Sequence, residues 1–375
     1  MADKVSIVKC DDYSRSKECV MEALSMIGGL KSIISEGDRV LLKPNVLAAR
    51  EPEDAVTTHP SIVAAMCELV KDAGGIPVIG DGAGITKPGA TAHAFRVSGI
   101  EDVAKSQGVR LLNFQTEGYT EMEVPDAMHF STLHISKAIK DADVIISLPK
   151  MKTHELTYYT GAVKNMFGVL PLKTRKEMHL LGDRKLFGEA VADLYSIAKP
   201  HLAVMDAVLG MEGNGPSHGT PIKSGVIMAS YDCVSLDVIA SGIMGVEPMN
   251  VPTTVAALEH GFGNSDPEVI GIDPKAVTKK YQPSSGGILF NLPPFIIRFF
   301  GKQFEMKPKI NTSKCVLCGA CSMNCSVKAI DEVGDHLEIN KDKCIMCYCC
   351  RELCPANAVD IDMSFVAKII TTIKR

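Results

Sequence analysis

The stretches CVLCGACSMNC, residues 315–325, and CIMCYCCRELC, residues 344–354, hold nine of the thirteen cysteines of this 375-residue chain. Each contains the spacing C-x2-C-x2-C-x3-C, and placing Cys315 on Cys344 brings the spaced cysteines of both stretches into register. The likeness continues outside the cysteines, since KINTSKC at 309–315 then falls on EINKDKC at 338–344. The repeat predicts a small module built from two similar halves.

This spacing predicts ligation of iron–sulfur clusters. Three cysteines so spaced can surround one face of a cubane, whereas the fourth lies too far along the chain and ligates the cluster of the other half. The predicted ligands of one 4Fe-4S cluster are Cys315, Cys318, Cys321 and Cys354, and those of a second are Cys344, Cys347, Cys350 and Cys325. Cys349 is out of register and is not expected to ligate. The alternative is a pair of zinc sites, but these join separated CxxC pairs and would leave the third cysteine without a role.

Residues 308–361 resemble the bacterial ferredoxins that hold two 4Fe-4S clusters. The resemblance implies a small α+β, ferredoxin-like two-cluster domain that transfers electrons. The chain departs from the family pattern at one place, because Pro355 follows the fourth cysteine of the second half whereas Ser326 takes that position in the first. Polarity and hydrogen bonding near a sulfur tune its potential, so we expect the two clusters to differ in potential.

Composition and charge narrow the classes of protein. The net charge of −4 comes from mixed acids and bases without a basic block, which argues against nucleic-acid binding. The N-terminus MADKVSIVKCDD lacks the pattern of a secretory signal, and clustered cysteines fit metal ligation in a reducing compartment, so we expect a cytoplasmic protein. The most apolar stretch, ILFNLPPFIIRFF at 288–300, is shorter than the roughly 20 residues that span a bilayer and contains two prolines and an arginine. No transmembrane segment is therefore expected.

Residues 1–273 alternate short apolar runs with helical patterns such as PSIVAAMCELVKDA at 60–73. The runs lie at 5–8, 39–42, 77–79, 110–114, 144–148, 202–205 and 225–229. Most of them lack strict alternation, which is the pattern of strands covered on both faces. The order predicts an α/β domain, a mostly parallel sheet with helices on both faces. Residues 119–136 differ, and they predict an antiparallel hairpin added at one edge of the sheet.

Polar groups follow four of the predicted strands. They are KPN at 43–45 with TTHP at 57–60, GDGAG at 80–84, PKMKTHELT at 149–157 with GAVKNMFG at 161–168, and Asp206 with MEGNGPSHG at 211–219. Ligands of parallel sheets bind outside the carboxyl ends of the strands, so these groups predict one site. Lysines that converge with glycine-rich loops suit a phosphate or a carboxylate. The alternative is that each lysine is an ordinary exposed charge.

The candidate residues of this site follow from those motifs. For binding an anionic small molecule they are Lys43, Asn45, Thr58, His59, Asp81, Lys150, Lys152, His154, Lys164, Asn165 and Asn214, with Arg175 and His179 as further candidates. The candidate catalytic residues are Lys43, Lys150, Lys152, His154, Lys164 and Asp206. Neither glycine-rich loop matches the dinucleotide or Walker A fingerprint, and the histidine spacing matches no metal motif.

KPN, TTHP, the GD after a strand, PKMKTH, GAVKNMFG and EGNGP together resemble the family called domain of unknown function 362, over roughly residues 38–245. The resemblance implies an α/β domain that is often followed by a C-terminal ferredoxin module, in proteins typical of anaerobic bacteria and archaea. It implies no settled reaction.

We therefore predict four segments in the chain. They are the α/β domain at 1–273, a connector at 274–307, the two-cluster domain at 308–361 and a helical tail at 362–375. The connector contains PSSGG and LPP, and we expect its apolar patch to dock onto the sheet domain, with a partner or membrane surface as the alternative. In the tail, Phe365, Ile369 and Ile373 fall on one helical stripe, which predicts that it docks too.

A binding site and a cluster module in one chain favour a ferredoxin-dependent oxidoreductase. In this hypothesis an external redox partner, a ferredoxin or a reductase, exchanges electrons with an anionic small molecule through the two clusters. One alternative is an electron-transfer or assembly protein without its own substrate, with the lysine-rich edge as a docking face. Another is a non-redox isomerase or lyase whose clusters are structural.

Overall fold

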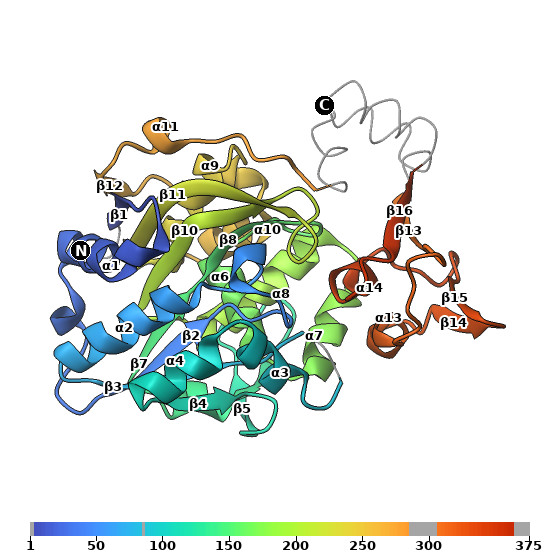
Figure 1. Cartoon of the computed structure of the whole chain (residues 1–375), viewed down its shortest axis with the longest axis horizontal. Helices are drawn as coiled ribbons and strands as arrows, with labels where there is room; N and C mark the ends of the chain where they lie inside the picture. Colours follow the sequence, from blue (N-terminus) through green and yellow to red (C-terminus); the bar gives the residue numbers. More distant parts are fainter. Residues whose placement is uncertain (1–3, 85–86, 285–305, 364–375) are drawn as a thin grey trace.

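The computed structural model describes residues 4–84, 87–284 and 306–363. Its largest element is a ten-stranded sheet in the order β12-β1-β11-β10-β7-β2-β3-β4, with β8 paired to β10 and β9 to β8. The strands are β1 (Lys4–Lys9), β2 (Arg39–Pro44), β3 (Ile76–Asp81), β4 (Arg110–Asn113), β7 (Val144–Leu148), β8 (Lys150–His154), β9 (Tyr158–Thr160), β10 (Leu202–Glu212), β11 (Thr220–Ser230) and β12 (Glu268–Gly271). Most neighbours are parallel, while β11 is antiparallel to β1 and β10, and β9 to β8. The predicted α/β class is confirmed (Figure 1).

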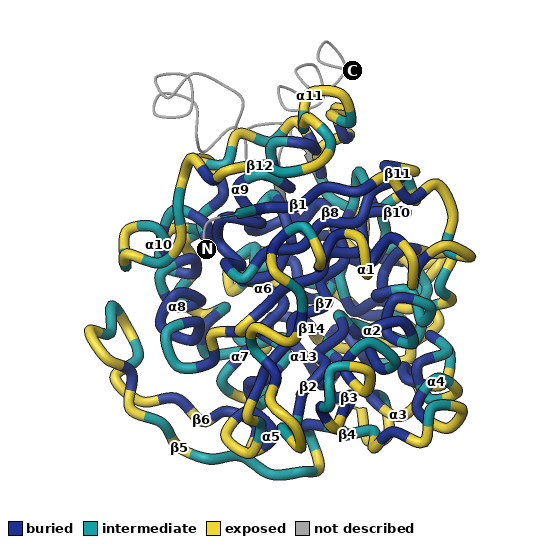
Figure 2. The backbone as a smooth tube through the Cα atoms, turned by 90° about the vertical axis from the view of Figure 1, so that its left-hand side faces the viewer, coloured by how far each residue is buried: buried dark blue, intermediate teal, exposed yellow. Residues whose placement is uncertain are grey.

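Helices cover both faces of this sheet (Figure 1). The helices on one face are α1 (Ser16–Ile27), α2 (Pro60–Asp72), α3 (Ala90–Val97) and α4 (Ile100–Gln107). Those packed into the core of the other face are α5 (Lys137–Lys140), α6 (Ala162–Asn165), α7 (Leu172–His179), α8 (Arg184–Ile197), α9 (Cys233–Ile243) and α10 (Pro252–Glu259), with the short α11 (Pro274–Val277) after β12. Figure 2 shows the buried strands enclosed between these helical layers.

The strand β2 shows why its apolar run does not alternate. Leu41 packs into the core on one face of the sheet, whereas Val40 and Leu42 pack into the core on the other. Successive side chains of a strand point to opposite faces, so a strand between two helical layers is apolar at every position.

The helix α2 follows from its local sequence. Pro60 occupies the first turn, where its missing N–H costs nothing, and the His59 side chain accepts a hydrogen bond from Ser61 N at the cap. Met66 and Val70 lie one turn apart on its buried face. The helix therefore begins at the last residue of the TTHP motif and fixes that motif at the sheet edge.

The predicted hairpin at 119–136 is present, but its predicted position at the edge of the large sheet is wrong. Its strands β5 (Tyr119–Glu123) and β6 (Thr132–Ser136) pair with each other in a separate two-stranded sheet. The loop between them is held over α8, because the Asp193 carboxylate accepts hydrogen bonds from the backbone N–H groups of Met128, His129 and Phe130. These tertiary hydrogen bonds draw the hairpin onto the helical layer.

The second unit, which we call the cysteine-rich domain, comprises the described residues 306–363 and lies beside the sheet domain, residues 4–284 (red in Figure 1). Its elements are β13 (Met306–Ile310), α13 (Ala320–Asn324), β14 (Ile330–Val333), β15 (His336–Ile339), α14 (Cys349–Glu352) and β16 (Val359–Met363). Strand β13 pairs with β16 and β14 with β15, both antiparallel. Most of the predicted connector and tail, including the apolar stretch at 288–300 and the stripe at 365–373, lies outside the described residues.

The two halves of the cysteine-rich domain repeat in three dimensions as in sequence. Ala329 N donates a hydrogen bond to Cys325 Sγ at 3.1 Å, and Ala358 N donates the equivalent bond to Cys354 Sγ at 3.2 Å. The elements follow the same order in each half, a short helix and then a strand. Among the described helices, none is long and apolar enough to cross a bilayer.

Candidate functional site

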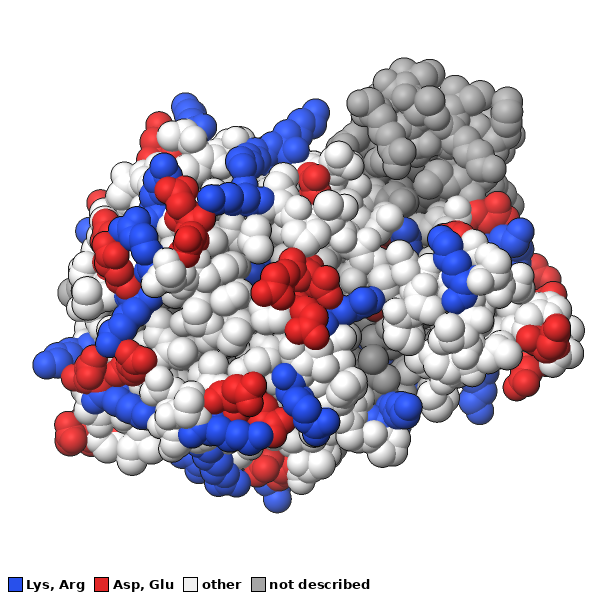
Figure 3. Space-filling view, viewed as in Figure 1, with Lys and Arg blue, Asp and Glu red and all other residues white. Residues whose placement is uncertain are grey.

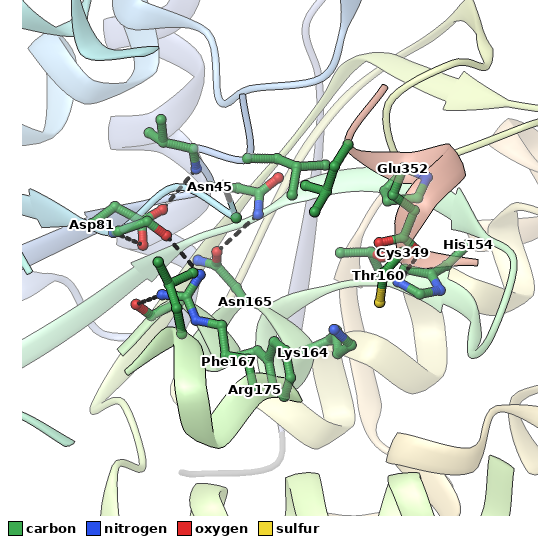
Figure 4. Close-up of a pocket in the computed structure, with 18 of the residues that line it drawn as sticks. Asn45, Asp81, His154, Thr160, Lys164, Asn165, Phe167, Arg175, Cys349 and Glu352 are labelled. Atoms are coloured by element: carbon green, nitrogen blue, oxygen red, sulfur yellow. Dashed lines mark hydrogen bonds and ion pairs between the residues drawn. The ribbon is translucent and has the colours of Figure 1, made fainter. Parts of the chain in front are cut away.

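A pocket at the carboxyl ends of β2, β3 and β8 is closed on one side by the cysteine-rich domain (Figure 4). It holds about 830 Å³ of empty space, part of it open to solvent. The predicted candidates that line it are Lys43, Asn45, Asp81, Lys152, His154, Lys164, Asn165, Arg175 and His179. Residues that were not predicted as candidates also line it, namely Thr160, Phe167, Cys349, Glu352 and Leu353.

The cysteine-rich domain is fixed against this pocket by polar contacts from α14 and α13. Arg351 Nη1 lies 2.6 Å from Glu155 Oε1 in a buried ion pair. Ser217 Oγ donates a hydrogen bond to the backbone oxygen of Glu352 at 2.5 Å. Lys176 Nζ, at the pocket lining, donates one to Met323 O at 2.8 Å. The pocket is therefore a joint product of both domains.

The floor of the pocket is a buried ion pair. Lys43 Nζ lies 2.7 Å from Asp81 Oδ1, and the two side chains are 0% and 2% exposed. Burial lowers the pKa of Lys43, and the Asp81 carboxylate opposes this shift. Asn165 Oδ1 accepts from Lys43 Nζ at 3.3 Å and from Asn45 Nδ2 at 3.2 Å. Gly168 is required here, since a Cβ at this residue would lie 2.3 Å from Asp81 Oδ1.

Lys152 is buried without a carboxylate as direct partner. Its Nζ donates to Asn45 Oδ1 at 2.6 Å and to Val56 O at 2.7 Å. Burial lowers its pKa to about 7, with the charge of Lys150 acting in the same direction. Lys152 therefore titrates near neutrality and shapes the electrostatics of the pocket.

A second polar end of the pocket lies toward the cysteine-rich domain. His154 Nδ1 accepts hydrogen bonds from Leu156 N at 3.0 Å and Thr157 N at 3.2 Å, so the neutral ring carries its proton on Nε2. His154 Nε2 lies 3.5 Å from Glu352 Oε1. Burial lowers the pKa of His154 well below its usual range, which keeps the ring neutral. Figure 4 shows His154, Glu352 and Cys349 grouped at this end.

Lys164 and His179 complete this end with aromatic neighbours. Lys164 Nζ lies 4.0 Å from the ring centroid of Phe167 and 5.2 Å from that of Phe187. Burial lowers the pKa of Lys164 to about 8, and the Glu352 charge opposes this. The His179 ring stacks on Phe187 with centroids 4.8 Å apart, and burial lowers its pKa to about 3.

Lys150, Asp206 and His59 form a separate network outside the pocket lining. Lys150 Nζ lies 2.9 Å from Asp206 Oδ2, with both side chains 0% exposed, and also donates to Tyr13 OH at 2.8 Å. His59 N donates to Asp206 Oδ2 at 2.9 Å, and the His59 ring stacks on Tyr13. These groups are hydrogen-bond partners of one another, and their contacts connect β8, β10 and the start of α2.

Three other candidates have supporting positions or lie elsewhere. Thr58 Oγ1 accepts from Asn45 N and donates to Leu148 O, so it holds the KPN loop. Arg175 lines the pocket, but its guanidinium donates to the backbone oxygens of Leu170, Gly82, Ala83 and Gly168. Asn214 is not among the lining residues.

The unpredicted residues had weak signals or none in the sequence. Thr160 lies between the motifs at 149–157 and 161–168, and a single neutral hydroxyl carries no sequence signal for anion binding. Glu352 and Cys349 belong to a segment more than 150 residues away, and nothing local indicates that it folds back onto the strand ends.

The cysteines of the cysteine-rich domain lie close to one another. One cavity is lined by all four predicted ligands of the first set, Cys315, Cys318, Cys321 and Cys354. Of the second set, Cys325 and Cys350 pack against the apolar cluster that contains Cys321 and Cys354. The amides that donate to Cys325 and Cys354 suit thiolate acceptors. The first set therefore lines a cavity and supplies the four thiolates that a 4Fe-4S cluster requires.

The backbone of the two cysteine loops carries matched strain. Leu317 and Met346 occupy equivalent positions after the first cysteine of each half and have φ of 52° and 54°. Non-glycine residues adopt this left-handed conformation at a cost, and it persists where the surrounding structure requires it. The same conformation at both positions indicates two loops with the same geometry.

Comparison with known proteins gives the following matches. Residues 40–242 match the family described as Domain of unknown function (DUF362), and residues 307–355 match the 4Fe-4S dicluster domain. The "Thylakoid-associated protein sll1697" of Synechocystis sp. (strain PCC 6803) is 30% identical over 320 residues, which are 82% of this chain and 96% of that protein. The lactate racemase apoprotein from Thermoanaerobacterium thermosaccharolyticum matches with a TM-score of 0.43 and 12% identity, over 64% of this chain and 57% of that one. The chain is an iron–sulfur protein with a 4Fe-4S ferredoxin-type domain, and it belongs to the DUF362 family.

Proposed function

We propose that this protein is an oxidoreductase that exchanges electrons between an external carrier and an anionic small molecule bound in the pocket. Two 4Fe-4S clusters are part of the proposal. Their ligands are the cysteine set 315, 318, 321 and 354, and the set 344, 347, 350 and 325. When bound, such clusters supply reversible one-electron transfer.

One observation carries this proposal. Helix α14 forms a wall of the pocket through Cys349 and Glu352, and it also contains Cys350, a proposed cluster ligand. Cys347 also lines a second, smaller cavity together with His179 and Phe187 of the sheet domain. A ligand in the pocket would thus lie against the segment that holds a cluster. Such proximity favours electron exchange between the two.

The other cysteine loop faces outward. Cys318 is exposed, and its neighbours Val316 and Leu317 are 65% and 52% exposed. The set that contains Cys318 is therefore within reach of an external redox partner, while the set that contains Cys347 faces the sheet domain. This difference supports a ferredoxin or a reductase as the partner.

Figure 3 shows that acidic and basic residues are interspersed on the viewed face, in keeping with the mixed charge of the sequence.

The alternative of a docking protein with a lysine-rich edge has less support. Lys43, Lys150 and Lys152 are 0%, 0% and 1% exposed, so they offer no charge to a protein surface.

The alternative of an isomerase or lyase with structural clusters differs in its prediction for Cys315→Ser and Cys344→Ser. Loss of activity in an intact fold supports redox coupling, whereas loss of the fold supports a structural role.

The proposal is tested with anaerobically purified protein whose clusters are reconstituted and reduced. Reoxidation is followed by visible absorbance in the presence of carboxylated and phosphorylated metabolites. We expect at least one to accelerate reoxidation in the parent and in Lys173→Met, an exposed lysine on α7, but not in Lys164→Met. Absence of any ligand-dependent reoxidation would overturn the proposal.

The cytoplasmic location and the anaerobic setting belong to the same proposal. The relative from Synechocystis is named for association with thylakoids, so cell fractionation of the native host distinguishes a cytoplasmic from a membrane-associated pool.

A further inference from the structure

Three hydrogen-bond donors converge at the end of the pocket that faces the cysteine-rich domain. In the β8–β9 ribbon Lys152 lies opposite Thr160, and His154 lies opposite Tyr158. Thr160 is thus the diagonal neighbour of His154 and projects from the same face of the ribbon. Lys164 follows on α6, which begins directly after β9. Figure 4 shows Thr160, His154 and Lys164 around a common space.

The donors are not used by the protein. Thr160 is 5% exposed, and its Oγ1 has no hydrogen-bond partner among the described residues. His154 presents its Nε2 proton, because Nδ1 accepts two backbone bonds, and the nearest acceptor recorded for it is Glu352 Oε1 at 3.5 Å. Lys164 Nζ rests on the Phe167 ring and makes no hydrogen bond within the described residues. A buried hydroxyl without a partner, such as Thr160 Oγ1, is costly, which indicates that a ligand supplies its partner.

Among the cationic side chains that line the pocket, Lys164 is the one whose charged group has no hydrogen-bond acceptor within the described residues. Lys43 is neutralised by Asp81, and the Arg175 guanidinium is occupied by four backbone oxygens. Lys152 Nζ donates to Asn45 Oδ1 and Val56 O, and Lys176 Nζ donates to Met323 O. A phosphate monoester carries up to two charges and favours a free guanidinium or several backbone N–H groups. One ammonium with two neutral donors instead matches a monoanion with two oxygens. Phe167 and Leu353 line the same cavity and offer apolar contact.

We propose that Lys164 Nζ, Thr160 Oγ and His154 Nε2 bind the carboxylate of a small monocarboxylic acid whose apolar part lies against Phe167 and Leu353. The inference rests on the proposed function in that it places the anionic ligand in the same pocket, and it narrows that ligand to a carboxylate at a defined subsite. Glu352 lines the same end of the pocket, with its Oε1 3.5 Å from His154 Nε2.

The test measures binding alone. Isothermal titration calorimetry and saturation-transfer NMR are performed on anaerobically reconstituted full-length protein with acetate, propionate, butyrate and benzoate, and with inorganic phosphate for comparison. We expect binding of at least one carboxylate in preference to phosphate. Lys164→Met removes a charge-assisted hydrogen bond and should raise the dissociation constant for the carboxylate by about tenfold or more.

Two further variants separate the subsite from a general electrostatic effect. Thr160→Val keeps the shape of the side chain and should weaken carboxylate binding by about fivefold. Lys173→Met, which removes the same charge from an exposed position, should leave it unchanged.

The outcomes separate this inference from the proposed function. No carboxylate binding, or preference for phosphate, overturns the carboxylate subsite, even if another ligand reoxidises the clusters. Binding that is equal in the parent and in Lys164→Met overturns it as well. Carboxylate binding with the expected order of variants, but without any effect on cluster reoxidation, supports the subsite and counts against the proposed function.

Discussion

Arg351 of the cysteine-rich domain and Glu155 of the sheet domain form a buried ion pair across the junction of the two domains, with 2.6 Å between Nη1 and Oε1. The exposed fractions of the two side chains are 9% and 2%. Removal of one partner from a buried pair is costly because the other charge stays in a medium of low dielectric constant. This pair therefore fixes the position of α14 at the pocket.

Arg351→Met should weaken docking of the cysteine-rich domain by about 3 kcal/mol, the typical cost of leaving a buried charge uncompensated. The measurement is the midpoint of anaerobic thermal unfolding, followed by visible absorbance and by circular dichroism. Lys341→Met is the control, because Lys341 and its partner Asp362 are exposed, with side-chain exposures of 54% and 42%. An equal midpoint in parent and Arg351→Met would show that the pair does not hold the junction.

Gly168→Ala should destabilise the sheet domain and disrupt the pocket floor. The added Cβ would lie 2.3 Å from Asp81 Oδ1 and 2.9 Å from Lys43 Nζ, so the buried ion pair must separate. We expect a loss of about 2 kcal/mol or more in urea unfolding, as for other overpacked or broken buried pairs. Gly242→Ala in α9 is the matched control, since no atom lies within 4 Å of its added Cβ. That variant should be neutral or slightly more stable.

The fold could be predicted from sequence where the signal is local. The run around Leu41 is apolar at successive positions because both faces of β2 are covered, and this pattern is visible in a few residues. The cysteine spacing is equally local. The hairpin at 119–136 was recognised for the same reason, but its place was not, because it depends on hydrogen bonds to Asp193, about 65 residues away.

The candidate site was predicted in part. The rule that ligands bind at strand ends selected Lys43, Lys152 and Lys164, which the structure brings to one pocket. The same rule selected Lys150, whose ammonium is taken by Asp206 on the neighbouring strand. A pairing between residues 56 positions apart leaves no trace in a local pattern. The position of Glu352 at the pocket likewise depends on contacts between residues far apart in the sequence, so a local pattern does not predict it.

The buried Lys152 should make stability depend on pH in a defined direction. Its pKa in the folded protein is lowered from 10.5 to about 7 by burial. Between these values the unfolded chain holds the proton and the folded protein does not, so stability rises with pH over this window and is flat below it. The gain between pH 7 and pH 9 should be about 2 kcal/mol. Urea unfolding at both pH values measures it.

Lys152→Met should lose this gain, because methionine fills a similar volume without a titrating group. Lys173→Met, at an exposed position on α7, should keep the pH dependence of the parent. The assignment fails if Lys152→Met and the parent gain the same stability between the two pH values.

The crossed ligation of the two clusters predicts a pattern in cysteine variants. Cys350→Ser and Cys325→Ser lie in different halves of the repeat, but both belong to the same proposed ligand set. Each should lower iron and acid-labile sulfide by about half. Both should remove the same component from the electron paramagnetic resonance spectrum of the reduced protein. Cys354→Ser should remove the other component.

Cys349→Ser is the matched control for this series, because Cys349 directly precedes Cys350 and lines the pocket without belonging to either set. It should keep the full iron content. If Cys325→Ser instead removed the same spectral component as Cys315→Ser, each half would ligate its own cluster. The pocket would then adjoin a cluster held entirely by residues 344–354, and the exchange of one sulfur between the halves would be refuted.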